Sequence, residues 1–484
     1  MNSWFVRIHF CFFVYIFQFI CVTIDSCILH EERKIKMNNN KEFLATEPIG
    51  KLLLRLAIPT LAAQMINMLY NIIDRNYIGH IPGRGALALT GVGVCMPLIM
   101  IISAFAALVG NGGAPRASIL MGKKDLDSAE NILGNCFTMQ IIISVILTLI
   151  MFFGNRTFLM AFGASENTIE YAVSYMNIYS LGTIFVQLTL GMNAFITAQG
   201  FAKTGMYSVL IGAVINIILD PIFIFACHMG VRGAALATII SQACSCVWVL
   251  SFLFGTRSTL RIKKQNLPLK APVILPCLAL GLSLFIMQAS ESIISVCFNS
   301  SLLKYGGDVA VGAMTILTSV MQFAMLPLQG LGQGAQPIMS YNYGAKESAR
   351  VRKIYLMTFE IVVGIMAVGT VICFVMPQTL MSMFTSNPET LTEGAIALHI
   401  ICAGFIASSV SVVSAGAFEA LGKGIQSFLI SFLRYVVVII PAAFVLSKTV
   451  GVHGVWHAFW IAEIITAVIA FILYYQLIGK SGKN

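Results

Sequence analysis

Two aspartates, Asp74 and Asp220, stand inside long apolar stretches of this chain, where an ionised side chain is costly. Asp74 has Tyr70 one helical turn before it, and Asp220 has Asn216 at the same spacing. Each acid therefore shares a helix face with a neutral hydrogen-bonding side chain. Burial favours the protonated form of a carboxyl group, and amide and hydroxyl oxygens can replace the hydration shell of a cation. The spacing predicts a site that binds and releases a proton or a sodium ion.

A third acid, Glu291, lies near the middle of another apolar stretch, close to Gln288. It could attract cationic substrates or bind the same ion, and Arg434 could instead neutralise it in a static ion pair. Met287 and Met321 flank this region, and flexible, polarizable methionines suit a pocket that admits many shapes. We therefore take Glu291, Gln288, Met287 and Met321 as candidate substrate-binding residues.

The other acids at membrane depth fit structural roles better. Glu463 shares a helical stripe with Trp456 and Trp460, which favours an anchor at a helix end. Glu419 has Lys423 four residues later, and this spacing predicts an interfacial ion pair.

The elements that carry these acids are predicted to be membrane-spanning helices. The sequence is 58% hydrophobic and 10% charged, with a mean hydropathy of +0.87, whereas soluble domains are about a quarter charged. Apolar runs long enough to span a bilayer fall at residues 54–79, 87–110, 131–153, 168–192, 206–227, 232–255, 273–299, 309–331, 352–376, 395–418, 425–447 and 453–478.

The chain also repeats itself. Four glycine and proline positions recur 222 residues later: Gly110, Gly112, Pro115 and Gly122 return as Gly332, Gly334, Pro337 and Gly344. Two copies with six spans each share one orientation, so an axis along the membrane normal relates them. The predicted fold is an all-α membrane protein with twelve transmembrane helices in two six-helix bundles, related by pseudo-two-fold symmetry along the membrane normal. Doubling of this kind is typical of secondary transporters.

This pattern divides the chain into an N-terminal extension and tail (1–47), an N-lobe (48–255), a cytoplasmic linker (256–272), a C-lobe (273–478) and a C-terminal tail (479–484). Residues 8–29 form an apolar run that a charged stretch at residues 31–34 follows, without the basic start or clear cleavage site of a signal peptide, so we expect translation to begin at Met37. Nineteen Lys and Arg residues lie in the loops of one side and five on the other. This asymmetry predicts that both ends of the twelve-helix body are cytoplasmic. Their placement orients the chain in a lipid bilayer and indicates no nucleic-acid partner.

Several other classes of chemistry are disfavoured. The twelve cysteines form no CxxC or Cys/His cluster, so we expect neither a disulfide framework nor a metal site, apart from sodium at Asp74 and Asp220. No P-loop, nucleophile elbow or HExxH helix is present, so an enzyme or an ATP-driven pump is not expected, and no cofactor is implied. An ion gradient is the remaining energy source.

Four motifs resemble the multidrug and toxic compound extrusion (MATE) transporters, most closely their MepA-type branch. They are residues 69–79 with Asp74, residues 216–221 with Asp220, residues 233–238, and residues 330–344. The resemblance implies a cation-coupling cluster at the matching positions Tyr70, Asp74, Asn193, Asn216, Asp220 and Thr238. It also implies a bending hinge at Pro59 and an acid near Glu291. Relatives with a C-lobe ion site carry an acid in the tenth helix, and residues 400–418 have none.

The resemblance implies a monomeric antiporter in a bacterial cytoplasmic membrane. It would export small amphipathic, often cationic drugs in exchange for H⁺ or Na⁺ as two bundles rock about a central cavity. The main alternative is a flippase for lipid-linked oligosaccharides or polyisoprenoids. That function calls for more cationic groups in the cavity than Arg75 and Arg434 supply.

Overall fold

The computed structural model describes residues 43–83, 85–382 and 387–476. The side chains of several residues between 291 and 315 lie outside this description, as does the expected start at Met37. Contacts divide the chain into a short N-terminal unit, of which helix α2 (Phe43–Thr46) is described, and a second unit from Glu47 onward. Everything below concerns the second unit.

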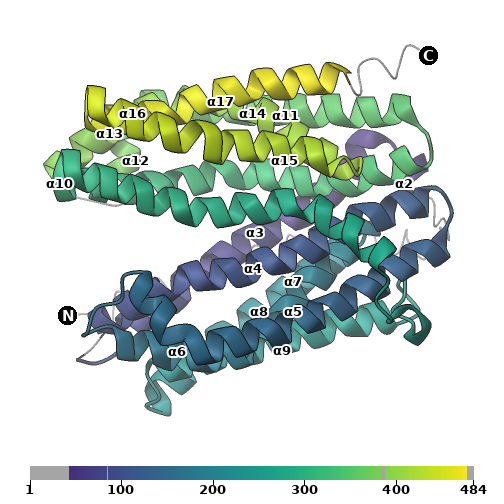
Figure 1. Ribbon diagram of the computed structural model, residues 1–484, viewed down its shortest axis with the longest axis horizontal. Coiled ribbons are helices and arrows are strands. Elements are labelled where there is room, and N and C mark those ends of the chain that lie inside the picture. Colours follow the sequence, from purple (N-terminus) through teal and green to yellow (C-terminus); the bar gives the residue numbers. More distant parts are fainter. Residues whose placement is uncertain (1–42, 84, 383–386, 477–484) are drawn as a thin grey trace. The chain divides into compact units, whose positions relative to one another are not determined.

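The second unit is built from helices, and no strand occurs in its described part. The N-lobe contains α3 (Ile49–Gly79), α4 (Gly85–Gly122), α5 (Leu126–Ala161), α6 (Ile169–Leu181), α7 (Thr183–Ala198), α8 (Ala202–Pro221), the π-helix η1 (Ile222–Ala226) and α9 (Val231–Phe254). The C-lobe contains α10 (Ala271–Gly344), α11 (Ser348–Val375), α12 (Pro377–Ser382), α13 (Pro388–Cys402), α14 (Phe405–Ala420), α15 (Gly424–Phe432), the π-helix η3 (Leu433–Ile439), α16 (Ile440–Val450) and α17 (Val452–Tyr474). Figure 1 shows the two bundles.

Helix α10 covers both the seventh and the eighth predicted span, because its backbone stays helical through residues 300–308, where the sequence predicts a loop. Gly281 lies against Leu108 of α4, and Gly344 lies against Ile119. These α4 residues are 11 positions apart, about 16 Å along a helix, whereas 63 residues of straight α10 would extend about 95 Å. Helix α10 therefore doubles back and crosses twice.

Counting spans in the described residues gives the predicted architecture. Nine helical segments are long and apolar enough to cross a membrane, among them α8 with η1 and α15 with η3 and α16, and two bent pairs raise this number to eleven. The pairs are α6 with α7, bent by 58°, and α13 with α14, bent by 52°. The second crossing of α10 is the twelfth span. The predicted fold class is thus confirmed.

The repeat extends to unusual backbone conformations. A positive φ angle recurs at an offset of 222 or 221 in three pairs of positions: Lys124 (64°) with Lys346 (63°), Gly200 (88°) with Gly422 (70°), and Gly230 (57°) with Gly451 (73°). Two of these residues are lysines, which rarely adopt this region, so the turns are imposed by the fold. After the first of these turns, Asp125 is the N-cap residue of α5, and its side chain accepts a hydrogen bond from Ser128 N at 3.1 Å. The hydrogen bonds from Ser128 lower the pKa of Asp125.

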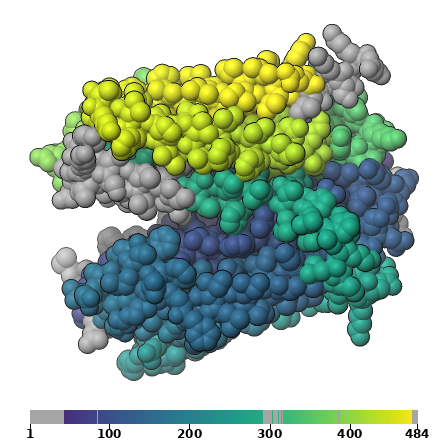
Figure 2. Space-filling model, viewed as in Figure 1, coloured from purple at the N-terminus to yellow at the C-terminus, as the bar shows by residue number. Residues whose placement is uncertain are grey.

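The lobes touch where glycines let helices approach closely. A Cβ atom at Gly112 of α4 would overlap the carbonyl oxygen of Cys277, and one at Gly281 would overlap that of Leu108. Gly122 and Gly344 make the same reciprocal approach to the backbone of Tyr341 and Ile119. All these contacts lie at the ends of α4 and α10 that the charge asymmetry predicts to be cytoplasmic. Figure 2 shows the lobes parted by a hollow at the other end.

The linker between the lobes is fixed to the N-lobe by buried polar groups. Oε1 of Gln199 accepts hydrogen bonds from the backbone N–H groups of Thr259 (2.8 Å) and Leu260 (2.9 Å). Glu130 accepts from Arg261 N at 3.2 Å and pairs with Lys263 Nζ at 2.5 Å. Three further bonds, between Asn135 and both Asn266 and Lys270 and between Thr138 and Leu267, follow the linker to the start of α10.

Replacing Gly112 by alanine should lower the free energy of unfolding by about 1–3 kcal/mol, because the new methyl group meets backbone that cannot move aside. Gly364 is the matched control, since nothing lies within 4 Å of a Cβ atom there. Gly364→Ala should be neutral or stabilise by up to about 1 kcal/mol. Thermal unfolding in detergent measures both variants, and equal midpoints would contradict the tight contact.

Candidate functional site

The two aspartates predicted to bind an ion come together between α3 and α8. The carboxyl groups of Asp74 and Asp220 lie within hydrogen-bond reach of each other. Both are buried, with 6% and 0% of their surface exposed. Asn216, itself 1% exposed, donates from Nδ2 to Asp220 Oδ1 at 3.3 Å. Two carboxylates this close cannot both stay negative, so the pair must share a proton or a cation.

Several oxygens around this pair have no donor in the described residues. They are Asp74 Oδ1, Asp220 Oδ2 and Asn216 Oδ1. Buried polar oxygens are nearly always satisfied in native proteins, so a group of unsatisfied ones calls for an explanation. Carboxylate and amide oxygens are suitable ligands for a hard cation, and a carboxylate oxygen can also accept a proton. The arrangement can therefore bind either ion.

The backbone around Asp220 explains why this site forms here. Pro221 follows directly and has no N–H group to donate, so the regular helix ends. The π-helix η1 continues the chain for five residues. Such π-helical turns are frequent at functional sites. On the facing side, Tyr77 of α3 packs edge-on against Phe225 of η1, with ring centroids 6.3 Å apart.

Three further residues were predicted for this cluster, and the structure treats them differently. Tyr70 lies beside Asp74 and interacts electrostatically with both aspartates. Thr238 of α9 reaches the cluster through the hydroxyl of Tyr175, which lies within hydrogen-bond reach of it. Asn193 of α7 donates instead to Gly205 O at 3.3 Å, and its Oδ1 has no donor in the described part of the chain. No contact joins Asn193 to the aspartates in these residues.

Two tyrosines of α6 complete the cluster and were missed. Tyr175 and Tyr179 are 3% and 5% exposed and stack with ring centroids 5.9 Å apart. Tyr175 is close to Asp74, and Tyr179 is close to Tyr70. Their spacing of four residues in an apolar stretch places them on one helix face, so the signal was present in the sequence.

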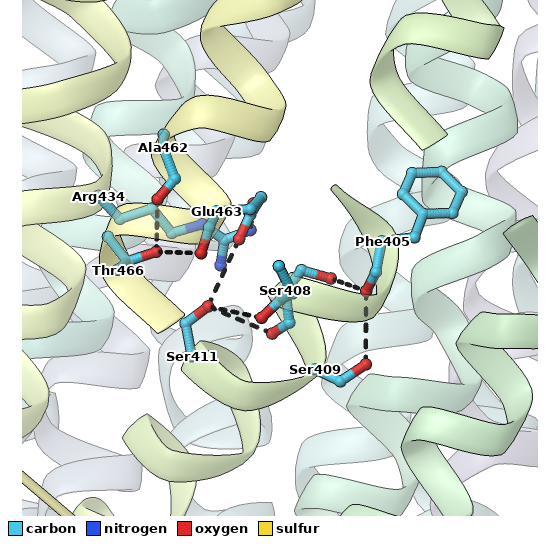
Figure 3. Close-up of polar contacts among 9 residues, drawn as sticks. Phe405, Ser408, Ser409, Ser411, Arg434, Ala462, Glu463 and Thr466 are labelled. Carbon is cyan, nitrogen blue, oxygen red and sulfur yellow. Dashed lines mark hydrogen bonds and ion pairs between the residues drawn. The ribbon is translucent and has the colours of Figure 1, made fainter. Parts of the chain in front are cut away.

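The C-lobe holds a buried ion pair between Arg434 of η3 and Glu463 of α17 (Figure 3). Only 12% and 9% of the two side chains are exposed. Ser411 of α14 donates to Glu463 Oε2 at 3.4 Å. The sequence had offered Arg434 as a partner for Glu291, and the pairing with Glu463 replaces the expected helix-end anchor. The side chain of Glu291 lies outside the described residues.

The expected interfacial pair between Glu419 and Lys423 is wrong. Glu419 is 7% exposed and accepts hydrogen bonds from Ser283 at 3.1 Å and Ser427 at 2.9 Å. The i, i+4 rule failed because α14 ends at Ala420 and the chain turns before Lys423, so the two residues do not share a helix.

The other candidate substrate residues, Met287, Gln288 and Met321, are half-buried on α10. Near them, Phe285 packs edge-on against Phe105 of the N-lobe, with ring centroids 4.9 Å apart. The predicted hinge, Pro59, is buried inside α3, which continues through it. The Thr60 hydroxyl lies within hydrogen-bond distance of Leu56 O and Ala57 O in the adjoining turn and of Gly330 O of α10, the nearest at 2.8 Å.

A family model described as MatE matches residues 59–222 and 283–445, one copy in each lobe. The chain belongs to the MATE family. Two curated relatives are multidrug export proteins named MepA. The one from Staphylococcus haemolyticus is 26% identical over 430 residues, covering 89% of this chain and 94% of the relative. The one from Staphylococcus aureus strain N315 is 23% identical over 435 residues, covering 90% and 95%.

Solved MATE structures share the fold. One, described as an outward-facing multidrug resistance MATE transporter, matches with a TM-score of 0.85 and 23% identity, covering 92% of this chain and 98% of the other. Another, a MATE protein in a bent conformation, gives a TM-score of 0.86 at 23% identity, covering 92% and 99%. This MATE chain therefore has the twelve-helix, two-lobe architecture, and members of the family are transporters rather than enzymes.

Replacing Arg434 alone should destabilise the protein strongly, because Glu463 would keep a buried charge without its partner. We expect Arg434→Met to lower the free energy of unfolding by about 3–5 kcal/mol. The double variant Arg434→Met, Glu463→Leu should recover most of this loss, since no buried charge remains. Thermal unfolding of the wild type, both single variants and the double variant tests this coupling, and additive effects would contradict it.

Proposed function

We propose that this protein is a secondary active antiporter that exports amphipathic, often cationic compounds in exchange for protons or sodium ions. The observation that carries the proposal is the buried pair of Asp74 and Asp220, in which one oxygen of each carboxyl group, Asp74 Oδ1 and Asp220 Oδ2, lacks a donor in the described residues. Charged carboxyl groups are costly inside a membrane, so these two aspartates favour a bound proton or cation. The charge of the pair therefore depends on the concentration of that ion on the side from which it binds.

The arrangement of the lobes supports exchange between two states. Contacts at the glycines of α4 and α10 close one end, and the hollow in Figure 2 opens toward the other. Asp74 lies five residues before the end of α3, and Asp220 lies one residue before the end of α8. The charge asymmetry predicts that these ends face outward. The ion site would thus load from outside in this state.

The relatives support the substrate class. Proteins named for multidrug export align with nearly the whole chain. Half-buried methionines and Gln288 on α10 suit compounds of varied shape, and Glu291 would favour positive charge. Antiport then requires only that the compound and the ion prefer different states of the lobes. We also propose that the protein acts as a monomer in the bacterial cytoplasmic membrane, with both ends of the helical body inside.

A bend of α3 at Pro59 would link the ion site to the cavity. A proline inside a helix leaves one carbonyl without its usual donor, which permits a bend. Thr60 ties this turn to Gly330 in the opposite lobe, so a bend here would change a contact between lobes. The solved MATE proteins include both a bent and a straight conformation, which fits such a role.

Replacing either aspartate by its amide should abolish uphill efflux, because an amide cannot exchange a proton and holds a cation poorly. The measurement is drug efflux from proteoliposomes under an imposed proton gradient or an imposed sodium gradient, one at a time. Glu360→Gln is the matched control, since Glu360 is an exposed acid on α11. Uphill transport at normal rates by both Asp74→Asn and Asp220→Asn would overturn the assignment. The gradient that drives the wild type identifies the ion.

A further inference from the structure

A second buried acid lies at the opposite end of the molecule, in the C-lobe. Glu419 lies one residue before the end of α14, so the tenth span does hold an acid, one position beyond residues 400–418. Hydroxyl groups of two other helices lie beside it: Ser283 of α10 and Ser427 of α15 contact Glu419, and Ser431 contacts Ser283. Ser283 and Ser427 are 1% and 0% exposed, and Ser431 is 7% exposed. No charged side chain lies within ion-pair distance of Glu419 in the described part of the chain.

Three oxygens of this cluster form a closed triangle. Glu419 Oε1 lies 3.1 Å from Ser283 Oγ and 2.9 Å from Ser427 Oγ, and the two hydroxyl oxygens are 2.8 Å apart. These separations are typical of oxygens joined by hydrogen bonds, about 2.5–3.0 Å. Each edge of the triangle therefore calls for one hydrogen atom.

Counting hydrogens shows what the triangle lacks. Each serine has one hydroxyl hydrogen, so the two serines supply two hydrogens for three edges. If Glu419 is ionised, one edge of the triangle has no hydrogen atom, so two oxygens lie at hydrogen-bond distance without a hydrogen bond. If Glu419 carries a proton on Oε1, each oxygen donates once and accepts once, and all three edges are bonded.

We propose that Glu419, Ser283 and Ser427 form a proton-binding site in the C-lobe. Glu419 carries the proton, and the two serines are positioning residues that close the ring of hydrogen bonds. The site lies near the turn at residues 421–423, on the side that the charge asymmetry predicts to be cytoplasmic. The Glu419 site is thus separate from the aspartate pair of the N-lobe, which lies near the ends of α3 and α8 that are predicted to face outward.

The titratable groups on the elements around Glu419 do not neutralise its charge in place of a proton. Lys423 stands in the turn, and burial lowers its pKa. Tyr355 of α11 bonds to Ser414 at 2.9 Å and stacks on Tyr474 of α17 with ring centroids 4.1 Å apart. The two charged groups nearest along η3 and α17, Arg434 and Glu463, are paired with each other. On α10 and α4, Cys277 lies against Arg116.

The internal repeat shows that this site belongs to the C-lobe alone. Positions 222 residues earlier hold Thr197 for Glu419 and Gly205 for Ser427. These residues face each other in the N-lobe, where a Cβ atom at Gly205 would lie 3.1 Å from Thr197 Oγ1. The same junction of two spans therefore exists in both lobes. Only the second copy has an acid and a serine at these two positions.

Infrared spectroscopy of the full-length protein in liposomes tests the site directly. The carbonyl stretch of a protonated carboxyl group is separate from that of a carboxylate. We expect the difference spectrum between wild type and Glu419→Gln to show the loss of one protonated-carboxyl band, the Glu419 band, separate from any band of the Asp74–Asp220 pair. Glu463→Gln is the matched control and should leave the band intact, because an acid paired with an arginine is ionised. A band of unchanged intensity in Glu419→Gln would overturn the proposal.

Two further measurements keep the test decisive if Glu419→Gln does not fold. The double variant Ser283→Ala, Ser427→Ala keeps the carboxyl group and removes its partners, so the band should shift to higher frequency. A band that does not move would exclude the ring. Adding sodium chloride at constant pH should leave the Glu419 band unchanged, and loss of that band would show a metal-cation site at Glu419 instead.

Protonation of Glu419 does not depend on transport, whereas its use in the cycle rests on the proposed antiport. The number of protons taken up per drug molecule should fall by one in Glu419→Gln. The spectra can also be recorded in Asp74→Asn, where transport is expected to be lost. The Glu419 band should persist there, so failure of the antiport proposal and failure of this one give different results. Loss of the band in Asp74→Asn would mean that it does not belong to Glu419.

Discussion

Hydrocarbon cannot hydrate a charge, and this single constraint organises the interior of the protein. Within the spans that the structure describes, three buried acidic centres satisfy it in three ways. Asp74 and Asp220 face each other and need a shared ion. Glu463 has a permanent partner in Arg434, so its charge is fixed. Glu419 accepts hydrogen bonds from serine hydroxyls and has no ion-pair partner among the described residues, so a proton would make it neutral. The type of partner therefore separates a structural acid from one that can change its charge.

The two lobes share a backbone but not its chemistry. Positive φ angles return at Lys124 and Lys346, and bends return where α6 meets α7 and α13 meets α14. These features depend on main-chain geometry, which a duplicated sequence conserves through glycines and turns. Side chains at equivalent positions differ, as with Asp220 and Ile440 before the two prolines. The two copies therefore have the same backbone arrangement, but they hold different polar side chains at different depths in the membrane.

Much of this could be predicted from the sequence, because hydropathy gives the spans and the recurrence of Gly112 and Gly334 gives the two lobes. The shared face of Asp220 and Asn216 followed from helical periodicity, and the structure keeps it. Periodicity says which residues share a face, but not which helix that face meets. It therefore could not pair Arg434 with Glu463, bury Glu419 among serines from α10 and α15, or separate Asn193 from the aspartates. Those outcomes depend on packing between elements far apart in the chain.

The contacts of the linker bear on where the N-lobe ends as a folded unit. By repeat and hydropathy the N-lobe finishes near residue 255, yet Glu130, Asn135 and Gln199 use backbone groups of residues 259–270 to satisfy their own buried oxygens and amides. A fragment cut at residue 255 would leave those side chains open to water or unsatisfied. One that keeps the chain through Lys270 would retain them all. The natural seam for splitting this transporter into two separately made halves is thus the peptide bond before α10.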